Sequence, residues 1–116
     1  MVVDVLFAGI AVADFGAALV WYARLFGRPA DLLAKNDEVM WRIAEAGWLY
    51  LVADSTRAGH ALVTLAVSNL KQTVAELTER GFRRPPIETV ADSGRKASLT
   101  DPEGNVLTFV EVARSE

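Results

Sequence analysis

Residues that could carry out catalysis or bind a metal are few in this sequence of 116 residues. It contains no cysteine, which excludes a thiolate nucleophile and a thiolate metal site, and it contains one histidine, His60. A single imidazole cannot assemble such a site without partners, and a lone histidine at the start of a strand is more often solvated than functional. The sequence also has no Ser-His-Asp elbow motif, no phosphate-binding glycine loop and no close carboxylate pair on one strand. We therefore predict no catalytic residue.

Aromatic side chains are the other candidates for a functional site. Phe7, Trp41, Trp48 and Tyr50 could line a cup for a small molecule, or they could form core beneath helices. Three tryptophans in a chain of this length are costly to bury completely, because each indole N–H needs a partner, whereas a cleft leaves one edge accessible. The cup is therefore favoured. Arg42 is expected on the opposite face of its hairpin, but inside the cup it would offer an anion-binding donor and change the ligand class.

Composition and charge restrict the class of protein. With 52% apolar and 23% charged residues, the chain has the composition of one compact domain with its own core. A formal net charge of −3 provides no basic surface for a nucleic-acid partner. No uncharged run approaches the roughly 18 residues of a membrane span, and no basic segment precedes an apolar one at the start. We expect a cytoplasmic protein without a nucleic-acid or membrane partner.

A strand and a helix are expected to position the first candidates. Residues 5–12 are apolar throughout, which predicts a strand buried on both faces. Asp14 is a suitable N-cap for a helix that runs to Phe26 and stops at Gly27. A short strand is expected within residues 28–33 or directly after them.

The remaining aromatic candidates fall in a predicted hairpin. Residues 38–44 and 47–53 read as its strands, and Glu45-Ala46 reads as a two-residue loop. Direct partners in a regular ladder share a face, and a shift of one residue would move every side chain to the other face. The regular ladder pairs Ile43 with Trp48, Trp41 with Tyr50 and Val39 with Val52.

The second half of the sequence repeats the first at an offset of about half the chain. Residues 65–70 (LAVSNL) align with residues 10–15 (IAVADF), and a helix capped by Asn69 and ended at Gly81 should follow. Three strands are then expected, at about 87–91, 95–100 and 106–112. Each half is thus a strand, a helix and three strands, which indicates an internal duplication within one domain.

Two features of the second half concern the last strands. The turn Asp101-Pro102-Glu103-Gly104-Asn105 should reverse the chain tightly before a buried strand. Glu111 has opposite side-chain parity to Thr108 on a regular strand, so it is expected to face solvent. The pair Arg95-Lys96 is likewise expected on a solvated face.

Together these motifs resemble the vicinal oxygen chelate superfamily, which includes glyoxalases, extradiol dioxygenases and bleomycin-resistance proteins. The resemblance covers essentially the whole chain, and it implies an α+β fold of two tandem βαβββ modules, about 1–58 and 59–116, that form a cupped half-barrel within one domain, commonly completed in a dimer. It rests on three segments, namely Gly9-Ile10-Ala11-Val12-Ala13-Asp14, Trp21-Tyr22-Ala23-Arg24-Leu25-Phe26-Gly27 and the turn at 101–105.

The resemblance also implies where metal ligands would stand, and this sequence departs from the pattern there. The metal enzymes of the family use His, Glu or Gln on the inner strands. Phe7, Leu62 and Thr108 occupy the corresponding positions, and the strand at 47–53 contains no carboxylate, histidine or glutamine. We expect no metal and no other cofactor, and therefore none of the family's Lewis-acid chemistry.

The sequence as a whole predicts a metal-free homodimer that sequesters a small apolar or aromatic molecule, as bleomycin-resistance proteins do. One alternative is a metal-dependent lyase or dioxygenase of the glyoxalase type, and another is a scaffold without a ligand. Whether any catalysis remains is left open. The expected ligand-binding residues are Phe7, Trp41, Trp48, Tyr50, Leu62 and Thr108.

Overall fold

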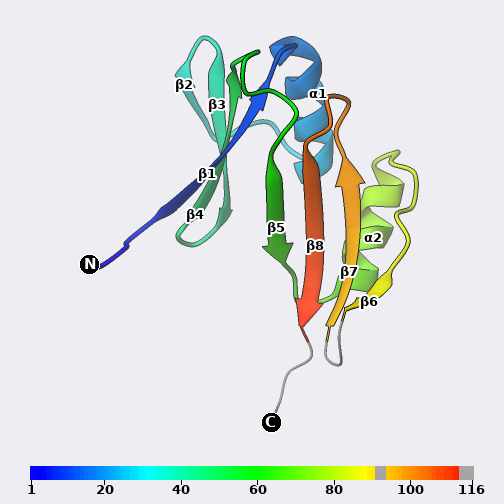
Figure 1. Cartoon of the computed structure of the whole chain (residues 1–116). Helices are drawn as coiled ribbons and strands as arrows, with labels where there is room; N and C mark the ends of the chain where they lie inside the picture. The colour runs from blue at the N-terminus through cyan, green and yellow to red at the C-terminus, as the bar shows by residue number, and fades with distance from the viewer. Residues whose placement is uncertain (91–93, 113–116) are drawn as a thin grey trace. The chain divides into compact units, whose positions relative to one another are not determined.

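The computed structural model describes residues 1–90 and 94–112 (Figure 1). Its contacts group the chain into two units, one holding residues 1–61 with 101–105 and the other holding the described residues of 62–100 and 106–112. In the first unit the elements are β1 (Leu6–Val12), α1 (Phe15–Phe26), β2 (Leu32–Lys35), β3 (Glu38–Ala44) and β4 (Gly47–Ala53). In the second they are β5 (Leu62–Ala66), α2 (Leu70–Glu79), β6 (Glu88–Val90), β7 (Gly94–Thr100) and β8 (Val106–Val112).

Both units have the same topology, as the duplication in the sequence predicts. The strand order is β1-β4-β3-β2 in the first sheet and β5-β8-β7-β6 in the second. In each sheet the first strand pairs in parallel with the last, and the other pairs are antiparallel. The fold is therefore two tandem βαβββ modules. Residue 91, which we assigned to the strand before β7, lies outside the described residues. Among the described residues, no helix is long and apolar enough to cross a membrane.

The first helix begins and ends where its capping residues predict. The Asp14 side chain accepts a hydrogen bond from the backbone N–H of Ala17 at 3.0 Å, which satisfies one of the free donors of the first turn. Gly27 ends the helix in a left-handed conformation with φ 72°, which glycine adopts without steric cost. Ala18, Tyr22 and Leu25 form the buried stripe of the helix.

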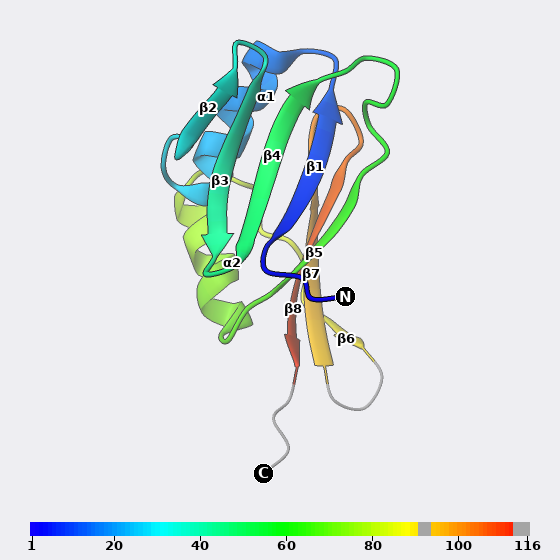
Figure 2. The same cartoon turned by 90° about the vertical axis from the view of Figure 1, so that its left-hand side faces the viewer.

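Side chains of alternate parity divide the first sheet into a face covered by α1 and an open face. Figure 2 shows β2, β3, β4 and β1 side by side with α1 behind them. The covered face carries the core of the unit, made by Ile10, Val12, Val39, Trp41, Leu49 and Leu51. The prediction that β1 is buried on both faces is wrong, because its open-face residue Phe7 is 51% exposed.

The predicted register of the β3–β4 hairpin is also wrong. The strands and the two-residue loop lie where expected, but the register shifts between Arg42 and Ala44. This irregularity leaves Ile43 as one extra residue on β3, so Trp41 pairs with Leu49 and Arg42 pairs with Trp48. Trp41 is therefore on the covered face. Arg42 lies on the open face with Trp48, where the predicted register had placed Trp41 and Ile43.

The second unit repeats the arrangement of helix and sheet. In Figure 1, β5, β8 and β7 lie side by side. Asn69 caps α2 by accepting a hydrogen bond from the N–H of Gln72 at 3.0 Å. The core between α2 and its sheet contains Leu70, Val74, Leu77, Ala97, Leu107 and Phe109.

The turn at 101–105 connects β7 to β8 but makes its hydrogen bonds with the first unit. The buried Asp101 accepts a hydrogen bond from the Tyr22 hydroxyl at 2.6 Å and one from the Asn105 amide at 2.8 Å. Asn105, which is fully buried, donates to the carbonyl of Ala11 at 3.2 Å and accepts from the N–H of Ala61 at 2.8 Å. Burial, followed by the hydrogen bond to Asp101, raises the pKa of Tyr22 well above its ordinary value.

A glutamate supplements the cap of each helix. The Glu103 carboxylate accepts from the N–H groups of Ala13 and Asp14, at 2.6 and 2.9 Å. In the second unit Glu111 accepts from the N–H of Leu70 at 2.7 Å. The prediction that Glu111 faces solvent is wrong, although its parity is opposite to that of Thr108 as expected, because α2 covers that face and the N-terminus of the helix attracts the carboxylate.

Candidate ligand-binding site

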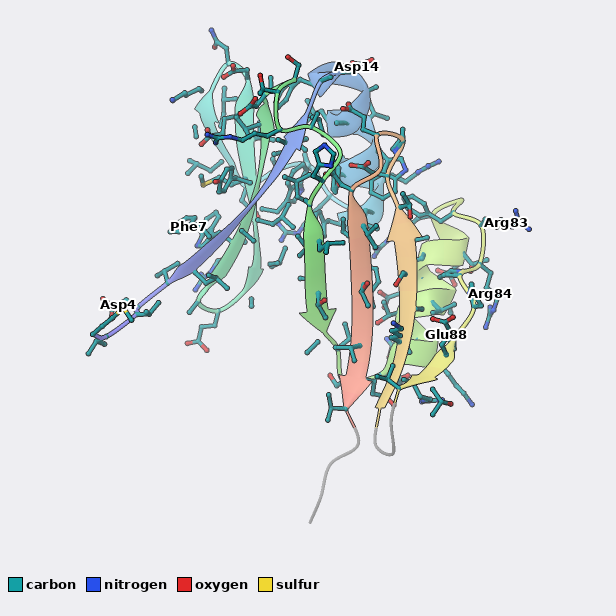
Figure 3. The ribbon with its side chains drawn as sticks, viewed as in Figure 1. Asp4, Phe7, Asp14, Arg83, Arg84 and Glu88 are labelled. Carbon is teal, nitrogen blue, oxygen red and sulfur yellow. The ribbon has the colours of Figure 1, made fainter. Side chains whose placement is uncertain are left out.

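The open face of the first sheet presents an aromatic surface. Phe7 and Trp48 are direct partners on β1 and β4, and their rings are stacked with centroids 6.3 Å apart and an angle of 21° between planes. Figure 3 labels Phe7 on β1. Half of its surface is accessible, so a planar ligand can reach the pair. We call Phe7, Trp48 and Tyr50 the aromatic surface.

Tyr50 lies across β1 because its partner there is Gly9. The two residues are paired in the parallel β1–β4 ladder. A Cβ added to Gly9 would collide with the Cζ and hydroxyl oxygen of Tyr50. The absence of a side chain at position 9 therefore lets the phenol ring lie over the strand backbone.

A pocket of about 300 Å³ opens beside Tyr50 on the same unit. Its walls are residues of β1 and β4 and of the connector that follows β4, namely Gly9, Ala11, Tyr50, Val52, Asp54, Arg57, His60 and Ala61. The Asp54 carboxylate orders the connector by accepting from the N–H groups of Thr56 and Arg57, at 3.1 and 3.3 Å. The other oxygen of Asp54 lies 3.7 Å from Nε of Arg57. The pocket thus has apolar residues of β1 and β4 on one side and the charged residues Asp54 and Arg57 of the connector on the other.

The two residues at the hairpin irregularity have exchanged the roles we predicted. Trp41 is fully buried, and its indole N–H donates to the carbonyl of Arg28 at 3.0 Å, so this tryptophan meets its hydrogen-bonding need inside the core. Its ring packs on Phe26, with centroids 5.4 Å apart. Arg42 is exposed on the open face, where its guanidinium donates to the carbonyl of Glu45.

An ion pair anchors the backbone of this hairpin. Asp31 binds the guanidinium of Arg28 at 2.5 Å and accepts from the backbone N–H of Arg42 at 2.7 Å. These contacts, first that with Arg28 and then that with Arg42, hold the pKa of Asp31 below its ordinary value. They position the strand that carries Arg42 without taking part in the pocket.

The two expected site residues of the second unit lie on the face of their sheet opposite α2. Leu62 is 83% exposed at the start of β5. Thr108 shares a hydrogen bond with Ser98 of the neighbouring strand, with their hydroxyl oxygens 2.9 Å apart. Thr64 pairs with Thr108 on the other side, so three neighbouring strands carry hydroxyl groups at one level of this sheet.

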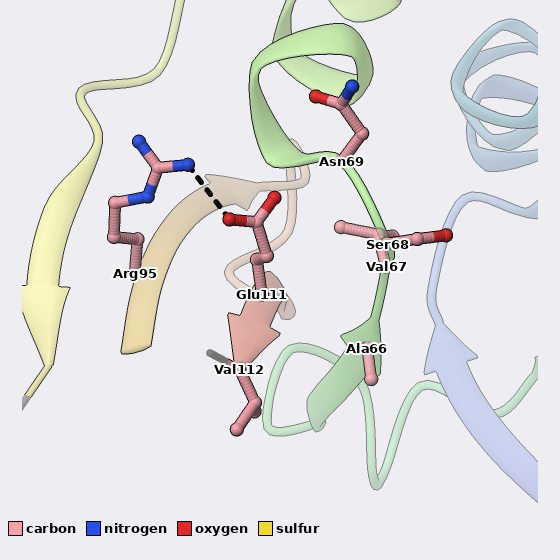
Figure 4. Close-up of a pocket in the computed structure, with 7 residues that line it drawn as sticks. All are labelled: Ala66, Val67, Ser68, Asn69, Arg95, Glu111 and Val112. Atoms are coloured by element: carbon pink, nitrogen blue, oxygen red, sulfur yellow. Dashed lines mark hydrogen bonds and ion pairs between the residues drawn. The ribbon is translucent and has the colours of Figure 1, made fainter. Parts of the chain in front are cut away.

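A second pocket, of about 640 Å³, lies at the N-terminus of α2 (Figure 4). Its charged groups already satisfy each other, since Arg95 binds Glu111 at 2.8 Å. The Arg95 guanidinium and then the Leu70 N–H lower the pKa of Glu111 below its ordinary value. The prediction that Arg95 is merely solvated is therefore wrong. The other lining residues are Ala66, Val67, Ser68, Asn69 and Val112.

The positions that resemble metal-ligand positions do not fit a divalent ion. Phe7 and Leu62 have no donor atom, and the Thr108 hydroxyl is engaged with Ser98. In the ranges 1–90 and 94–112 no three histidine, aspartate or glutamate side chains gather closely enough to hold an ion. The chemistry of these side chains suits the contact of an organic ligand better than the coordination of a metal.

The site differs from the predicted one by more than Trp41 and Arg42. The sequence pointed to Phe7, Trp48 and Tyr50, and the structure brings these three together. It missed Gly9, which has no side chain to mark it as a site residue, and it missed Asp54 and Arg57, because residues 54–59 read as a polar connector without a function. The only signal for Asp54 and Arg57 was an Asp followed closely by Ser, Thr and Arg, a pattern typical of a loop ordered by its aspartate.

Solved structures match this chain over nearly its full length. The chain is 40% identical to a glyoxalase/bleomycin resistance protein from Catenulispora acidiphila, with a TM-score of 0.87, over 95% of this chain and 99% of that one. It is 19% identical to a bleomycin-binding protein in complex with bleomycin, with a TM-score of 0.75, over 94% and 98% of the two chains. It is 24% identical to an antibiotic-binding protein from a Streptomyces species, with a TM-score of 0.73, over 97% and 98%. Searches of protein-family models and of curated proteins gave no match.

Proposed function

Because the chain belongs to the glyoxalase/bleomycin-resistance family of the vicinal oxygen chelate superfamily, we propose that it is a binding protein that sequesters a small apolar or aromatic molecule. The observation that carries this proposal is the accessible stack of Phe7 and Trp48 beside Tyr50 and its pocket. Two structural neighbours bind bleomycin or an antibiotic. They support a binding role for the shared fold.

The aromatic surface is suited to a flat ring. Each well-placed aromatic contact contributes about 0.5–1.5 kcal/mol beyond the burial of its area. The rings of Phe7 and Trp48 are held on adjacent strands, so little side-chain freedom is lost when a ligand binds. Stacking with additional burial in the pocket of about 300 Å³ accounts for binding without covalent chemistry.

The proposed activity needs no metal, since Phe7, Leu62 and Thr108 stand where the metal enzymes of the family hold their ligands. Elemental analysis of the purified protein tests this point. We expect no stoichiometric zinc, nickel, iron or manganese after dialysis. About one equivalent of such a metal per chain would favour the alternative of a lyase or dioxygenase of the glyoxalase type.

Binding is tested by intrinsic fluorescence with a panel of aromatic compounds. A ligand that stacks on Trp48 should change tryptophan emission, and Trp48→Ala should abolish most of that response. The melting temperature should stay within a few degrees, because Trp48 lies on the open face and its truncation leaves no closed cavity.

Trp41→Ala is the matched control. Trp41 is fully buried, so this variant should lose about 3–5 kcal/mol of stability through the cavity that it creates. If both variants unfold and no compound changes wild-type fluorescence, the chain is better described as a scaffold without a ligand. If Trp48→Ala is stable and retains the full ligand response, the aromatic surface is not the binding site.

A further inference from the structure

We propose that the pocket beside Tyr50 is a subsite for an oxyanion, so that the preferred ligand is an aromatic ring that carries a carboxylate or a similar group. This inference rests on the proposed function, because it specifies the ligand of the same site. The aromatic surface would hold the ring, and the pocket would hold the charged substituent.

Hydrogen-bond donors without partners dominate the rim of the pocket. Within the described residues, the hydroxyl of Tyr50 and the imidazole of His60 make no hydrogen bond to another protein group. The guanidinium of Arg57 makes one ion pair among the residues that the structure describes, between its Nε and Asp54. Three different donor groups therefore line one small space, and an acceptor with several lone pairs, such as a carboxylate, satisfies such a set.

The negative charge of Asp54 would repel an oxyanion in the pocket, but protein groups already engage both of its carboxylate oxygens. Its Oδ1 already accepts from two backbone N–H groups, and its Oδ2 faces Nε of Arg57 at 3.7 Å. Asp54 thus engages one edge of the guanidinium and leaves the two terminal nitrogens for a ligand. A carboxylate that orients an arginine in this way favours planar, bidentate recognition of an anion.

The spacing along β1 connects the two parts of the site. Phe7, Gly9 and Ala11 follow each other on the open face, so at the ordinary rise of a strand the wall of the pocket begins about 7 Å from Phe7, at Gly9, and continues to Ala11 at about 13 Å. Gly9 is the part of the pocket wall nearest the stack, and the ring of Tyr50 covers it. A bicyclic ring with one short substituent can therefore contact the aromatic surface and reach the pocket.

Calorimetric titration with three probes of one shape tests the proposal. The probes are 2-naphthoate, 2-naphthamide and 2-naphthylmethylammonium, which are anionic, neutral and cationic at neutral pH. We expect wild-type protein to bind the carboxylate roughly threefold to tenfold more tightly than the amide, and the ammonium least tightly, because hydrogen bonds to a charged acceptor outweigh those to a neutral one.

Variants of Arg57 test whether this residue causes the preference for the carboxylate over the amide. Arg57→Gln should bring the affinity for the carboxylate down to that for the amide and leave the amide unchanged, whereas Arg57→Lys should keep part of the preference. The side chain is 84% exposed, so neither change should disturb folding. Arg83→Gln is the control, because it removes the same charge from an exposed position of the second unit.

The possible results separate this inference from the function on which it rests. Equal wild-type affinities for carboxylate and amide, a preference for the ammonium, or a preference that survives Arg57→Gln would each overturn the oxyanion subsite while leaving the aromatic surface intact. If none of the three probes binds, both the subsite and the proposed function are overturned.

Discussion

At the scale of single residues, the missing side chain of Gly9 decides where the ring of Tyr50 lies. The ring occupies the space that any Cβ at position 9 would need. A binding surface of this kind is shaped as much by a glycine as by the aromatic residues that contact the ligand.

Gly9→Ala should therefore alter binding more than stability. The colliding atoms belong to the far end of the Tyr50 side chain, which can swing away, so we expect the unfolding free energy to change by no more than about 1 kcal/mol. The displaced ring should partly block the pocket, and the affinity for 2-naphthamide should fall. Fluorescence titration and chemical denaturation measure the two effects.

Gly16→Ala provides the comparison, because an added Cβ there would meet only the Asp14 carboxylate at an ordinary 3.9 Å. This variant should bind the amide as wild type does. Unchanged binding by Gly9→Ala would show that the position of the Tyr50 ring does not matter for the ligand.

At the scale of elements, the sequence predicted those features that depend on residues close together in the chain, such as the starts of the helices. The caps at Asp14 and Asn69 act on the residues directly after them, and the first residue of each helix follows from these contacts. The two copies of the βαβββ pattern were visible because each copy repeats the same apolar and capping residues. The resemblance implied two tandem βαβββ modules, whereas the strand order and the parallel pairing come from the structure.

The sequence could not predict which side of the hairpin is covered. One extra residue at Ile43 reverses the faces of Trp41 and Arg42, and nothing in the residues around Ile43 distinguishes an irregular ladder from a regular one. Glu111 illustrates the same limit, since parity gave its side but not the helix that covers that side. Such choices depend on tertiary packing rather than on local pattern.

The contacts of Glu111 give the second unit a pH-dependent stability. Its pKa is lowered in the folded chain by Arg95 and by the Leu70 N–H, so its contribution is present above the unfolded-state pKa of about 4.3 and is lost as the pH falls through the folded-state pKa. Glu111→Gln should lower the melting temperature at pH 7. The difference from wild type should begin to shrink below about pH 4 and disappear once the pH has fallen through the lowered pKa of the folded carboxylate.

Glu88→Gln, at an exposed position of β6, is the control for this experiment. It should leave the melting temperature close to that of wild type across the same pH range. A constant difference between wild type and Glu111→Gln at every pH would mean that the ionised form of Glu111 does not stabilise the cap of α2.

At the scale of the whole molecule, apolar side chains remain exposed in the segment before β1, at the start of β1 and on β2. The exposed fractions are 67% for Val3, 66% for Leu6 and 65% for Leu33. Large apolar side chains exposed at the edges of a sheet often mark an interface between proteins. We therefore predict a homodimer.

Light scattering at micromolar concentration should give twice the chain mass of 12.6 kDa. Leu6→Asp should shift the equilibrium towards the monomer, because a charge buried at an interface is costly. Val20→Asp, on α1 and 71% exposed, should not. A monomer mass for wild type would contradict the prediction.

The turn at 101–105 has a consequence for the order in which the chain can fold during synthesis. The Tyr22 hydroxyl finds its acceptor 79 residues later, and the Ala11 carbonyl finds Asn105 94 residues later. Contacts with such separations form slowly, because the intervening chain must first be closed into a loop. During synthesis these two groups of the first module therefore have no partner from the turn until most of the second module has been translated. We expect a first module expressed alone to be less stable than one that is supplied with the turn.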